Sequence, residues 1–341
     1  MGRRSASPLR AAAAVFLATA LGACASSSGP PEMTREQKLE LYTETASYLY
    51  EDGSFLRAQD QAVKALELDP ENQAMRRMIG WIRLRMGATR DLTIAEEFFR
   101  ALRDEGDQHP ATIQGLATVC ERLGLGYDQA SKQYARGERE PQEGQSVEAA
   151  ASEAQALAMD YWNEAGELYQ STLDDGEGST RSKNGLQRVF AYRGEFEASL
   201  AMSEQVVEEA QAERDQWRRM LESRDLTERD EELMRENEAA ATRLLYDTRL
   251  FAADLLYKRG AFAEALEHVE EATLLDPGQP ELYSLRAQLR AKLNDHAGAV
   301  EDIDRYLKLS DTPLEHPDVR QAFDLRAQCE EALSRLPAQD G

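Results

Sequence analysis

The 341-residue sequence is poor in the residues and motifs that most often carry enzyme chemistry. It has three cysteines and four histidines, and none of the histidines stands in an HExxH or related metal-ligand spacing. The GxSxG nucleophile elbow and the GxxxxGK[ST] phosphate loop are absent as well. We therefore expect no enzyme: no catalytic residues, no metal site, no cofactor and no small-molecule substrate.

The short glycine pair Gly124-Leu125-Gly126 does not change this expectation. A dinucleotide-binding glycine motif follows a β-strand and opens a helix. Here the pair is predicted to lie between two helices, so it does not indicate a nucleotide site.

Positive charge is also scarce. The chain has 40 Lys and Arg against 63 Asp and Glu, a net charge of −23. Such an acidic chain repels nucleic acid and anionic lipid headgroups, so we expect no nucleic-acid partner. The negative charge favours a partner with basic segments. A solvated surface that serves only solubility explains the charge equally well.

The N-terminus lacks an apolar run long enough to cross a bilayer. The run at 11–23 is too short to span one. It follows Arg3, Arg4 and Arg10 and ends in small residues, which is typical of a secretory signal peptide over 1–23. Removing 1–23 deletes those three arginines and no acidic residue, which takes the net charge from −23 to −26.

Leu21-Gly22-Ala23-Cys24 resembles the lipobox of bacterial lipoproteins. The resemblance implies cleavage before Cys24 and acylation of that cysteine, which would anchor the chain to a membrane. Ala25 follows instead of Asp, and in the Gram-negative sorting pattern this favours the periplasmic side of the outer membrane over the inner membrane. Residues 24–33 are a Ser/Gly/Pro tether, and Thr34 with Gln37 predicts a capping box that opens the first helix.

The rest of the chain is organised by a repeated pattern of small residues with a period of about 34. Two adjacent blocks and one distant block share it. The blocks are Ala253, Gly260, Phe262, Ala265, Ala272, Pro277; Ala287, Asn294, His296, Ala299, Tyr306, Asp311; and Ala46, Gly53, Phe55, Ala58, Ala65, Pro70.

Each residue type that recurs in the three blocks has a steric reason to be there. The alanines let two antiparallel helices approach closely. Gly53 and Gly260 end the first helix of a block, where a residue that takes positive φ readily is favoured. Pro70 and Pro277 stop the second helix.

The three blocks closely resemble tetratricopeptide repeats. The resemblance implies an all-α helix-turn-helix solenoid, a right-handed superhelix of roughly six to seven repeats with a concave groove. We expect an N-terminal array at 34–135, a hinge at 136–146, a C-terminal array at 147–313, and a capping helix with a tail at 314–341.

The period breaks between 198 and 259, where both helices are about twice the usual repeat length. We expect one elongated antiparallel hairpin, closed by Trp217, Met220, Leu221, Leu233 and Met234. It could serve as a docking arm or a brace across the groove, or it could be an insertion that only packs on its neighbours.

Cys120 and Cys329 could pair in an oxidising compartment, but they stand several repeats apart. Two separate buried thiols are favoured.

In tetratricopeptide repeats, certain first-helix positions tend to face the groove. That resemblance assigns the partner-binding surface to Thr43, Ser47, Tyr50, Arg77, Trp81, Leu84, Arg85, Leu250, Asp254, Tyr257, Lys258, Gln288 and Lys292. Trp81 between Arg77 and Arg85 is the cluster most typical of a binding hot spot, because Trp and Arg are enriched in such spots; Trp81 could also simply fill a gap between repeats.

The expected function is that of a membrane-anchored periplasmic scaffold that binds other envelope proteins. Resemblance to known repeat lipoproteins implies assembly of a pilus, secretin or secretion machine, insertion of barrel proteins, or the holding of cell-wall hydrolases. The sequence does not choose among them. An enzyme, or a regulatory subunit of one, is the contrasting possibility.

Overall fold

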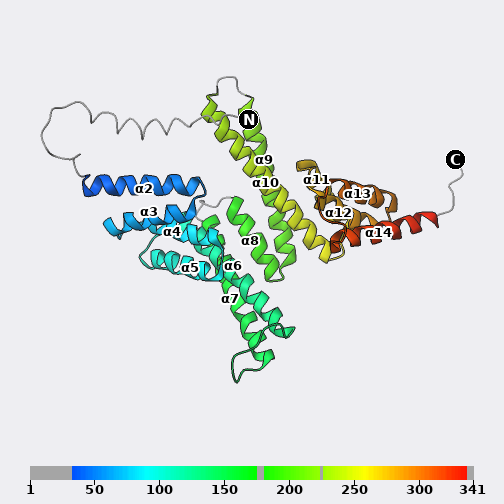
Figure 1. Ribbon diagram of the computed structural model, residues 1–341, viewed down its shortest axis with the longest axis horizontal. Helices are drawn as coiled ribbons and strands as arrows, with labels where there is room; N and C mark the ends of the chain where they lie inside the picture. The colour runs from blue at the N-terminus through cyan, green and yellow to red at the C-terminus, as the bar shows by residue number, and fades with distance from the viewer. Residues whose placement is uncertain (1–32, 175–179, 223–225, 336–341) are drawn as a thin grey trace. The chain divides into compact units, whose positions relative to one another are not determined.

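The structure is a computed structural model that describes residues 33–174, 180–222 and 226–335. Every element in these ranges is helical, which confirms the all-α expectation. In chain order the helices are α2 (Arg35–Glu51), α3 (Phe55–Leu68), α4 (Gln73–Met86), α5 (Thr89–Asp104), α6 (Pro110–Ala135), α7 (Val147–Asp174), α8 (Thr180–Tyr192), α9 (Phe196–Leu221), α10 (Glu228–Lys258), α11 (Phe262–Leu275), α12 (Pro280–Lys292), α13 (His296–Leu309) and α14 (Pro317–Ser334) (Figure 1).

The chain divides into two compact units, and the boundary falls between Ile82 and Arg83, within α4. The expected signal peptide at 1–23, Cys24 and nearly all of the tether lie outside the described residues.

Unit 1 begins as the sequence predicts. The Thr34 hydroxyl accepts a hydrogen bond from the Gln37 backbone N–H at 3.2 Å, and the Gln37 side chain accepts from the Thr34 N–H at 2.9 Å. This reciprocal capping box satisfies two backbone donors that a helix start leaves open. The predicted start of α2 is therefore confirmed.

Small residues bring α2 and α3 together. Ala46 and Ala58 are fully buried, and Leu49 and Ala58 share an apolar cluster with Ile82. Gly53, in the turn after α2, has a φ of +76°, the left-handed region that glycine enters without steric cost. The repeat pattern thus predicted both the close approach and the turn.

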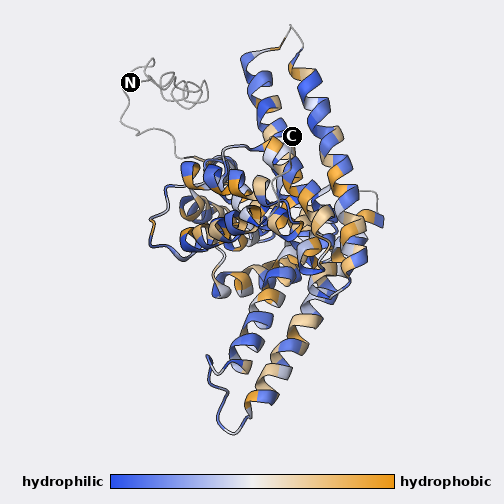
Figure 2. Cartoon of the chain, turned by 90° about the vertical axis from the view of Figure 1, so that its right-hand side faces the viewer, coloured by the Kyte–Doolittle hydropathy of each residue, from blue (hydrophilic) through white to orange (hydrophobic). Residues whose placement is uncertain are grey.

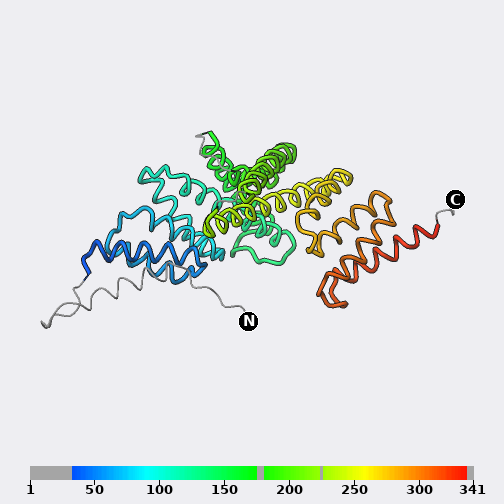
Figure 3. Tube along the Cα trace, turned by 90° about the horizontal axis from the view of Figure 1, so that it is seen from above, coloured from blue at the N-terminus to red at the C-terminus, as the bar shows by residue number. Residues whose placement is uncertain are grey.

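Unit 2 repeats the arrangement in α10/α11 and α12/α13, which follow one another in sequence order (Figure 3). Gly260 has a φ of +78° after α10, and Asn294 takes the equivalent place after α12 with a φ of +64°. Asparagine is among the few other residues that adopt this region readily. The predicted capping helix is α14, which packs Val319 and Cys329 onto the apolar cluster of α12 and α13.

One helix of unit 2 differs from the sequence expectation. Residues 110–135 form one continuous helix, α6, so Gly124 lies inside a helix and not between two. A Cβ built on Gly124 would lie 2.4 Å from Nε1 of Trp162, which explains the glycine without a turn. Residues 136–146 connect α6 to α7, and these two helices pack along each other; that the segment is a hinge between arrays stays a prediction.

The elongated hairpin is present as α9 and α10, with 26 and 31 residues. Its end is not closed in the expected way. Leu233 is 56% exposed and Met220 is 37% exposed, whereas Trp217, Leu221 and Met234 are half-buried. Two antiparallel helices cannot by themselves cover side chains on all of these faces. Figure 2 shows this end as mostly hydrophilic with separate hydrophobic residues.

Cys120 and Cys329 are separate, buried thiols, as favoured from their spacing. Within the described ranges, no His, Cys, Asp and Glu side chains cluster in a way that could hold a metal ion. No helix in those ranges combines the length and the apolarity needed to cross a membrane.

Candidate functional site

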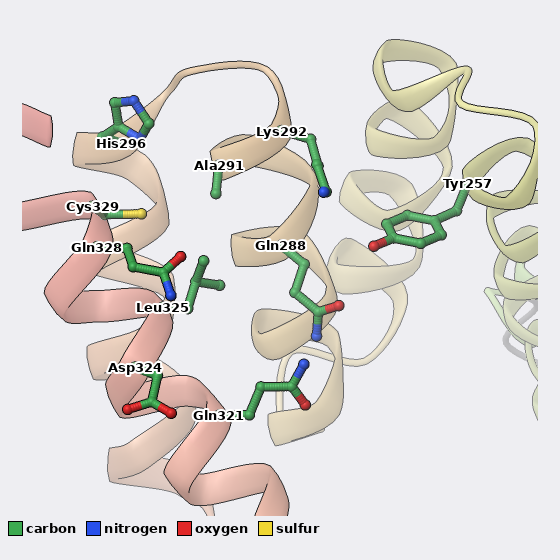
Figure 4. A pocket seen from close by; sticks show the side chains of 10 residues that line it. All are labelled: Tyr257, Gln288, Ala291, Lys292, His296, Gln321, Asp324, Leu325, Gln328 and Cys329. Atoms are coloured by element: carbon green, nitrogen blue, oxygen red, sulfur yellow. The ribbon is translucent and has the colours of Figure 1, made fainter.

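A groove in unit 2 runs between α12 and α14, with the C-terminal end of α10 beside it (Figure 4). The cavity at its centre has a volume of about 470 Å³. Its lining comes from helices that are adjacent in the solenoid but separated in the sequence. The lining residues are Tyr257, Gln288, Ala291, Lys292, His296, Gln321, Asp324, Leu325, Gln328 and Cys329.

The groove continues toward the N-terminal ends of α12 and α14. A neighbouring hollow of about 240 Å³ shares Gln288, Gln321 and Leu325 with the central cavity. Glu281 and Asp318 lie at its far end. The two hollows therefore form one channel that follows α12 over most of its length.

Amide side chains dominate the channel. Gln288 comes from α12, and Gln321 and Gln328 come from α14; the side chains of Gln288 and Gln321 point toward one another in Figure 4. A primary amide carries both a donor and an acceptor, which are the two groups that an extended backbone presents along its edges. The channel can therefore hydrogen-bond a peptide without reading its side chains.

Charge is ordered along the channel. Lys292 lies at the C-terminal end of α12, is exposed, and has no ion-pair partner among the described residues. At the opposite end, Glu281 and Asp318 are both acidic and exposed. A bound chain would thus meet Lys292 at one end, Asp324 in the central cavity, and two further acids at the other end.

The channel lining near Lys292 includes the buried thiol of Cys329. Cys329 is 2% exposed, and burial raises the pKa of its thiol, so the group is protonated near neutral pH. Nδ1 of His296 is buried and finds no hydrogen-bond partner within the described part of the chain.

Three of the predicted groove residues are brought together here: Tyr257, Gln288 and Lys292. Their neighbours on α10 lie outside the channel lining. Asp254 and Lys258 form an ion pair at 2.5 Å one turn apart, and Leu250 is half-buried. Only the end of α10 reaches the site.

Five of the predicted groove residues lie in unit 1. Ser47 donates its hydroxyl proton to the Thr43 carbonyl at 3.0 Å, and both residues are half-buried. Tyr50 packs against the ring of Phe55 at 5.6 Å between centroids, as part of the apolar cluster of α2 and α3. Arg77 and Trp81 are half-buried on α4.

The remaining two predicted residues belong to unit 2. Leu84 is 2% exposed, so it packs inside the unit and offers no groove contact. Its carbonyl accepts a hydrogen bond from Arg122 at 2.8 Å. Arg85 is exposed on the last turn of α4.

Sequence reasoning missed the contribution of α14, because that helix was interpreted only as a cap. A signal was available. Gln321, Asp324 and Gln328 are spaced by three and four residues, which places them on one face of a helix. That polar stripe faces α12 across the channel.

No known protein family matches this chain, and no curated protein does. Among solved structures, it is similar to a tetratricopeptide repeat protein from Parabacteroides merdae ATCC 43184, with 18% identity, coverage of 85% of this chain and 99% of that chain, and a TM-score of 0.37. It is also similar to the assembly chaperone of RpL4, Acl4 (18% identity, 90% and 91% coverage, TM-score 0.39), and to pilF of Pseudomonas aeruginosa (13% identity, 90% and 95% coverage, TM-score 0.35).

These identities concern the fold alone and carry no information on partners. What the channel binds has to be inferred from its own side chains. The helix order and the turns described above are those of a tetratricopeptide-type helical solenoid.

Proposed function

We propose that this chain is a protein-interaction scaffold that binds an extended segment of a partner in the channel between α12 and α14. The observation that carries the proposal is the set of three amide side chains, Gln288 from α12 and Gln321 and Gln328 from α14, in an open channel of about 470 Å³ at its centre. Such a channel suits a flexible polypeptide because it satisfies backbone groups in an extended conformation.

The length of the channel sets the length of the segment. From Glu281 to Lys292, α12 rises about 16 Å at 1.5 Å per residue. An extended chain covers that distance with about five residues at roughly 3.3 Å each. The partner segment carries a basic residue at the end near Glu281 and Asp318, and an acidic group at the end near Lys292.

The charge order can be tested with a panel of synthetic extended hexapeptides that carry Lys and Glu at opposite ends, Glu at both ends, or Lys at both ends. Fluorescence anisotropy should show the strongest binding for the mixed peptide. Lys292→Glu reverses one charge of the channel, so the mixed peptide should bind about fivefold more weakly, since an exposed charge contact contributes up to about 1 kcal/mol. The peptide with Lys at both ends should gain affinity.

Lys308→Glu is the matched control, because Lys308 is an exposed lysine on α13 that does not line the channel. It should leave the ranking of the peptides unchanged. Equal binding of all peptides to both variants would contradict the proposal.

We further propose that Cys24 is acylated and holds the scaffold on the periplasmic side of a bacterial outer membrane, where its partners are envelope proteins. The proposal is supported by Leu21-Gly22-Ala23-Cys24 behind the signal-like 1–23. Assembly of a pilus, secretin or secretion machine, the insertion of barrel proteins, and the holding of cell-wall hydrolases are all compatible jobs. Cys24→Ser should transfer the protein from the membrane fraction to the soluble periplasmic fraction; retention in the membrane would rule the anchor out.

A further inference from the structure

The outer end of the α9/α10 hairpin has no core of its own. We define the hairpin end as residues 215–222 and 226–240. None of these residues is buried, whereas Arg214 and Ala241, at its inner limit, are 8% and 3% exposed. The hairpin end is therefore not required to complete the packing of the solenoid.

Large apolar side chains are nevertheless concentrated there. Trp217, Met220 and Leu221 share one face of α9, since they are three and four residues apart. On α10, Leu233 is more than half exposed at 56%, and Met220 across the hairpin is 37% exposed. Exposed apolar groups gathered in one place on an otherwise polar element mark an interaction surface.

The surroundings of these apolar groups are acidic. The hairpin end contains eight acidic residues and four arginines, a net charge of −4. Two of the arginines are already neutralised, because Arg218 pairs with Glu238 at 2.8 Å and Arg235 pairs with Glu231 at 2.6 Å. Six acids and two arginines of the hairpin end remain outside these two ion pairs, so its net charge of −4 is unchanged.

Helix geometry places two of these acids directly beside Leu233. Asp230 and Glu236 stand three residues before and after it, which makes them its neighbours on the surface of α10. Both are exposed. An apolar group framed by carboxylates matches a helix that carries large apolar residues on one face and Lys or Arg at its edges.

We propose that the hairpin end docks a basic amphipathic helix of a partner protein. A second copy of this chain is a poor occupant, because symmetric pairing would bring two hairpin ends of net charge −4 together. The site is separate from the channel of α12 and α14, so it gives the scaffold a second surface for a partner of different chemistry. Its existence does not depend on the channel binding a peptide.

The probe for the test is a fluorescent 18-residue helical peptide with Leu along one face and Lys on either side. Its controls are a peptide of the same composition in scrambled order and a peptide with Glu in place of Lys. The purified chain should bind the first peptide at least tenfold more tightly than either control, measured by anisotropy. Binding should also change the fluorescence of Trp217, and Trp217→Phe should abolish that change.

Two variants locate the site. Leu233→Ser combined with Met220→Ser should weaken binding at least tenfold, whereas Leu274→Ser should not, although Leu274 is 78% exposed on α11. Glu232→Lys with Glu236→Lys, which reverse the charges of the exposed acid next to Leu233 in sequence and of one of its neighbours on the helix surface, should weaken binding by a similar factor. The matched control is Glu204→Lys with Glu208→Lys, which changes two exposed acids at the same spacing lower on the hairpin.

Far-ultraviolet circular dichroism checks that each variant remains folded. Equal binding of the scrambled peptide, or an equal loss with Leu274→Ser, would overturn the proposal, since either result means unspecific attraction to an acidic chain. A concentration-dependent dimer that Leu233→Ser dissolves would also overturn it, because the occupant would then be a second copy. Lys292→Glu in the channel should leave this binding unchanged.

Discussion

The hairpins α6/α7 and α9/α10 have the same topology and similar lengths. They differ in how far buried residues extend toward the connection between their two helices. In α6/α7, buried positions continue to Ala130 on the outgoing helix and resume at Ala150 on the returning one. In α9/α10, they stop at Arg214 and resume only at Ala241. The helices of α6/α7 therefore pack against each other over most of their length, whereas the outer ends of α9 and α10 have no buried side chains between them.

The side chains at the seam explain the difference. Ala150, Ala154 and Ala158 let α7 lie close to α6, where the rings of Tyr127 and Tyr161 stack at 5.6 Å. Small groups that interdigitate leave less apolar surface uncovered, although Leu125, Val147 and Leu157 on the outside of this hairpin remain 36%, 37% and 36% exposed. The end of α9/α10 has bulkier residues and many charges at the corresponding places, and these cannot interdigitate between only two helices.

The strongest contrast is expected between two ion pairs. Glu121 in α6 is 4% exposed and accepts hydrogen bonds from Arg188 Nε at 2.6 Å and from the Tyr169 hydroxyl at 3.0 Å. Glu121→Ala leaves the Arg188 charge without its partner in a mostly buried site, so we expect a loss of about 3–5 kcal/mol in the free energy of unfolding. Glu238→Ala, which breaks the more exposed pair with Arg218, should cost less than about 1 kcal/mol. Urea denaturation measures both, and equal losses would refute the comparison.

Thiol labelling tests how closed each hairpin is. Cys120 in α6 is fully buried, and burial raises the pKa of its thiol, so it should react with a thiol reagent at pH 8 only when the structure opens. Met220→Cys places a thiol on the exposed hairpin end, where it should react at least about 100-fold faster. Labelling is read by mass spectrometry of the peptide that carries each cysteine. Similar rates would show that α6/α7 is not closed.

Two glycines of α6 separate packing from helix propensity. A Cβ at Gly124 would meet the Trp162 indole at 2.4 Å, so Gly124→Ala should destabilise by about 1–3 kcal/mol through overpacking. Gly126 has open space around its Cα, so Gly126→Ala should stabilise by about 0.5–1 kcal/mol. Thermal unfolding of the two variants gives opposite shifts if the indole contact is real. A stabilising Gly124→Ala would show that Trp162 moves aside freely.

The smallest effect is expected at the hairpin end. Leu233→Ala should change the free energy of unfolding by no more than about 0.5 kcal/mol, because the side chain is mostly in water. Leu245→Ala on the same helix is the reference, since Leu245 is 2% exposed and its truncation should cost about 2–5 kcal/mol. A large loss at Leu233 would mean that it supports the fold and is not kept for a partner.

The sequence alone predicts features that depend on one residue or on its immediate neighbours in the chain. Gly53 and Gly260 were predicted to end helices because the positive φ that this requires is a property of one residue. Pro70 and Pro277 were predicted to stop helices because a proline restricts the residues next to it in the chain. The interior position of Gly124 could not be predicted in this way. The residue that excludes a Cβ at this position, Trp162, lies on another helix. The sequence does not distinguish a glycine required by close packing from a glycine required by a turn.

For a similar reason, the sequence predicted the channel residues of α12 but not those of α14. Gln288 and Lys292 follow from the repeat register of α12, which the sequence carries clearly. Gln321 and Gln328 lie on α14, beyond the last recognisable repeat, where no register assigns a face. Their role depends on where α14 packs, and that is fixed by contacts with α13.

Site-specific photocrosslinking in cells is the most direct test of the central claim that the channel binds a partner segment. A photoreactive amino acid at Gln321, which lines the channel, should give a discrete crosslinked adduct that Lys292→Glu weakens and Lys308→Glu does not. The same amino acid at Arg320, an exposed neighbour that does not line the channel, should give little or none. Equal adducts from both positions, or an adduct indifferent to Lys292→Glu, would contradict the account.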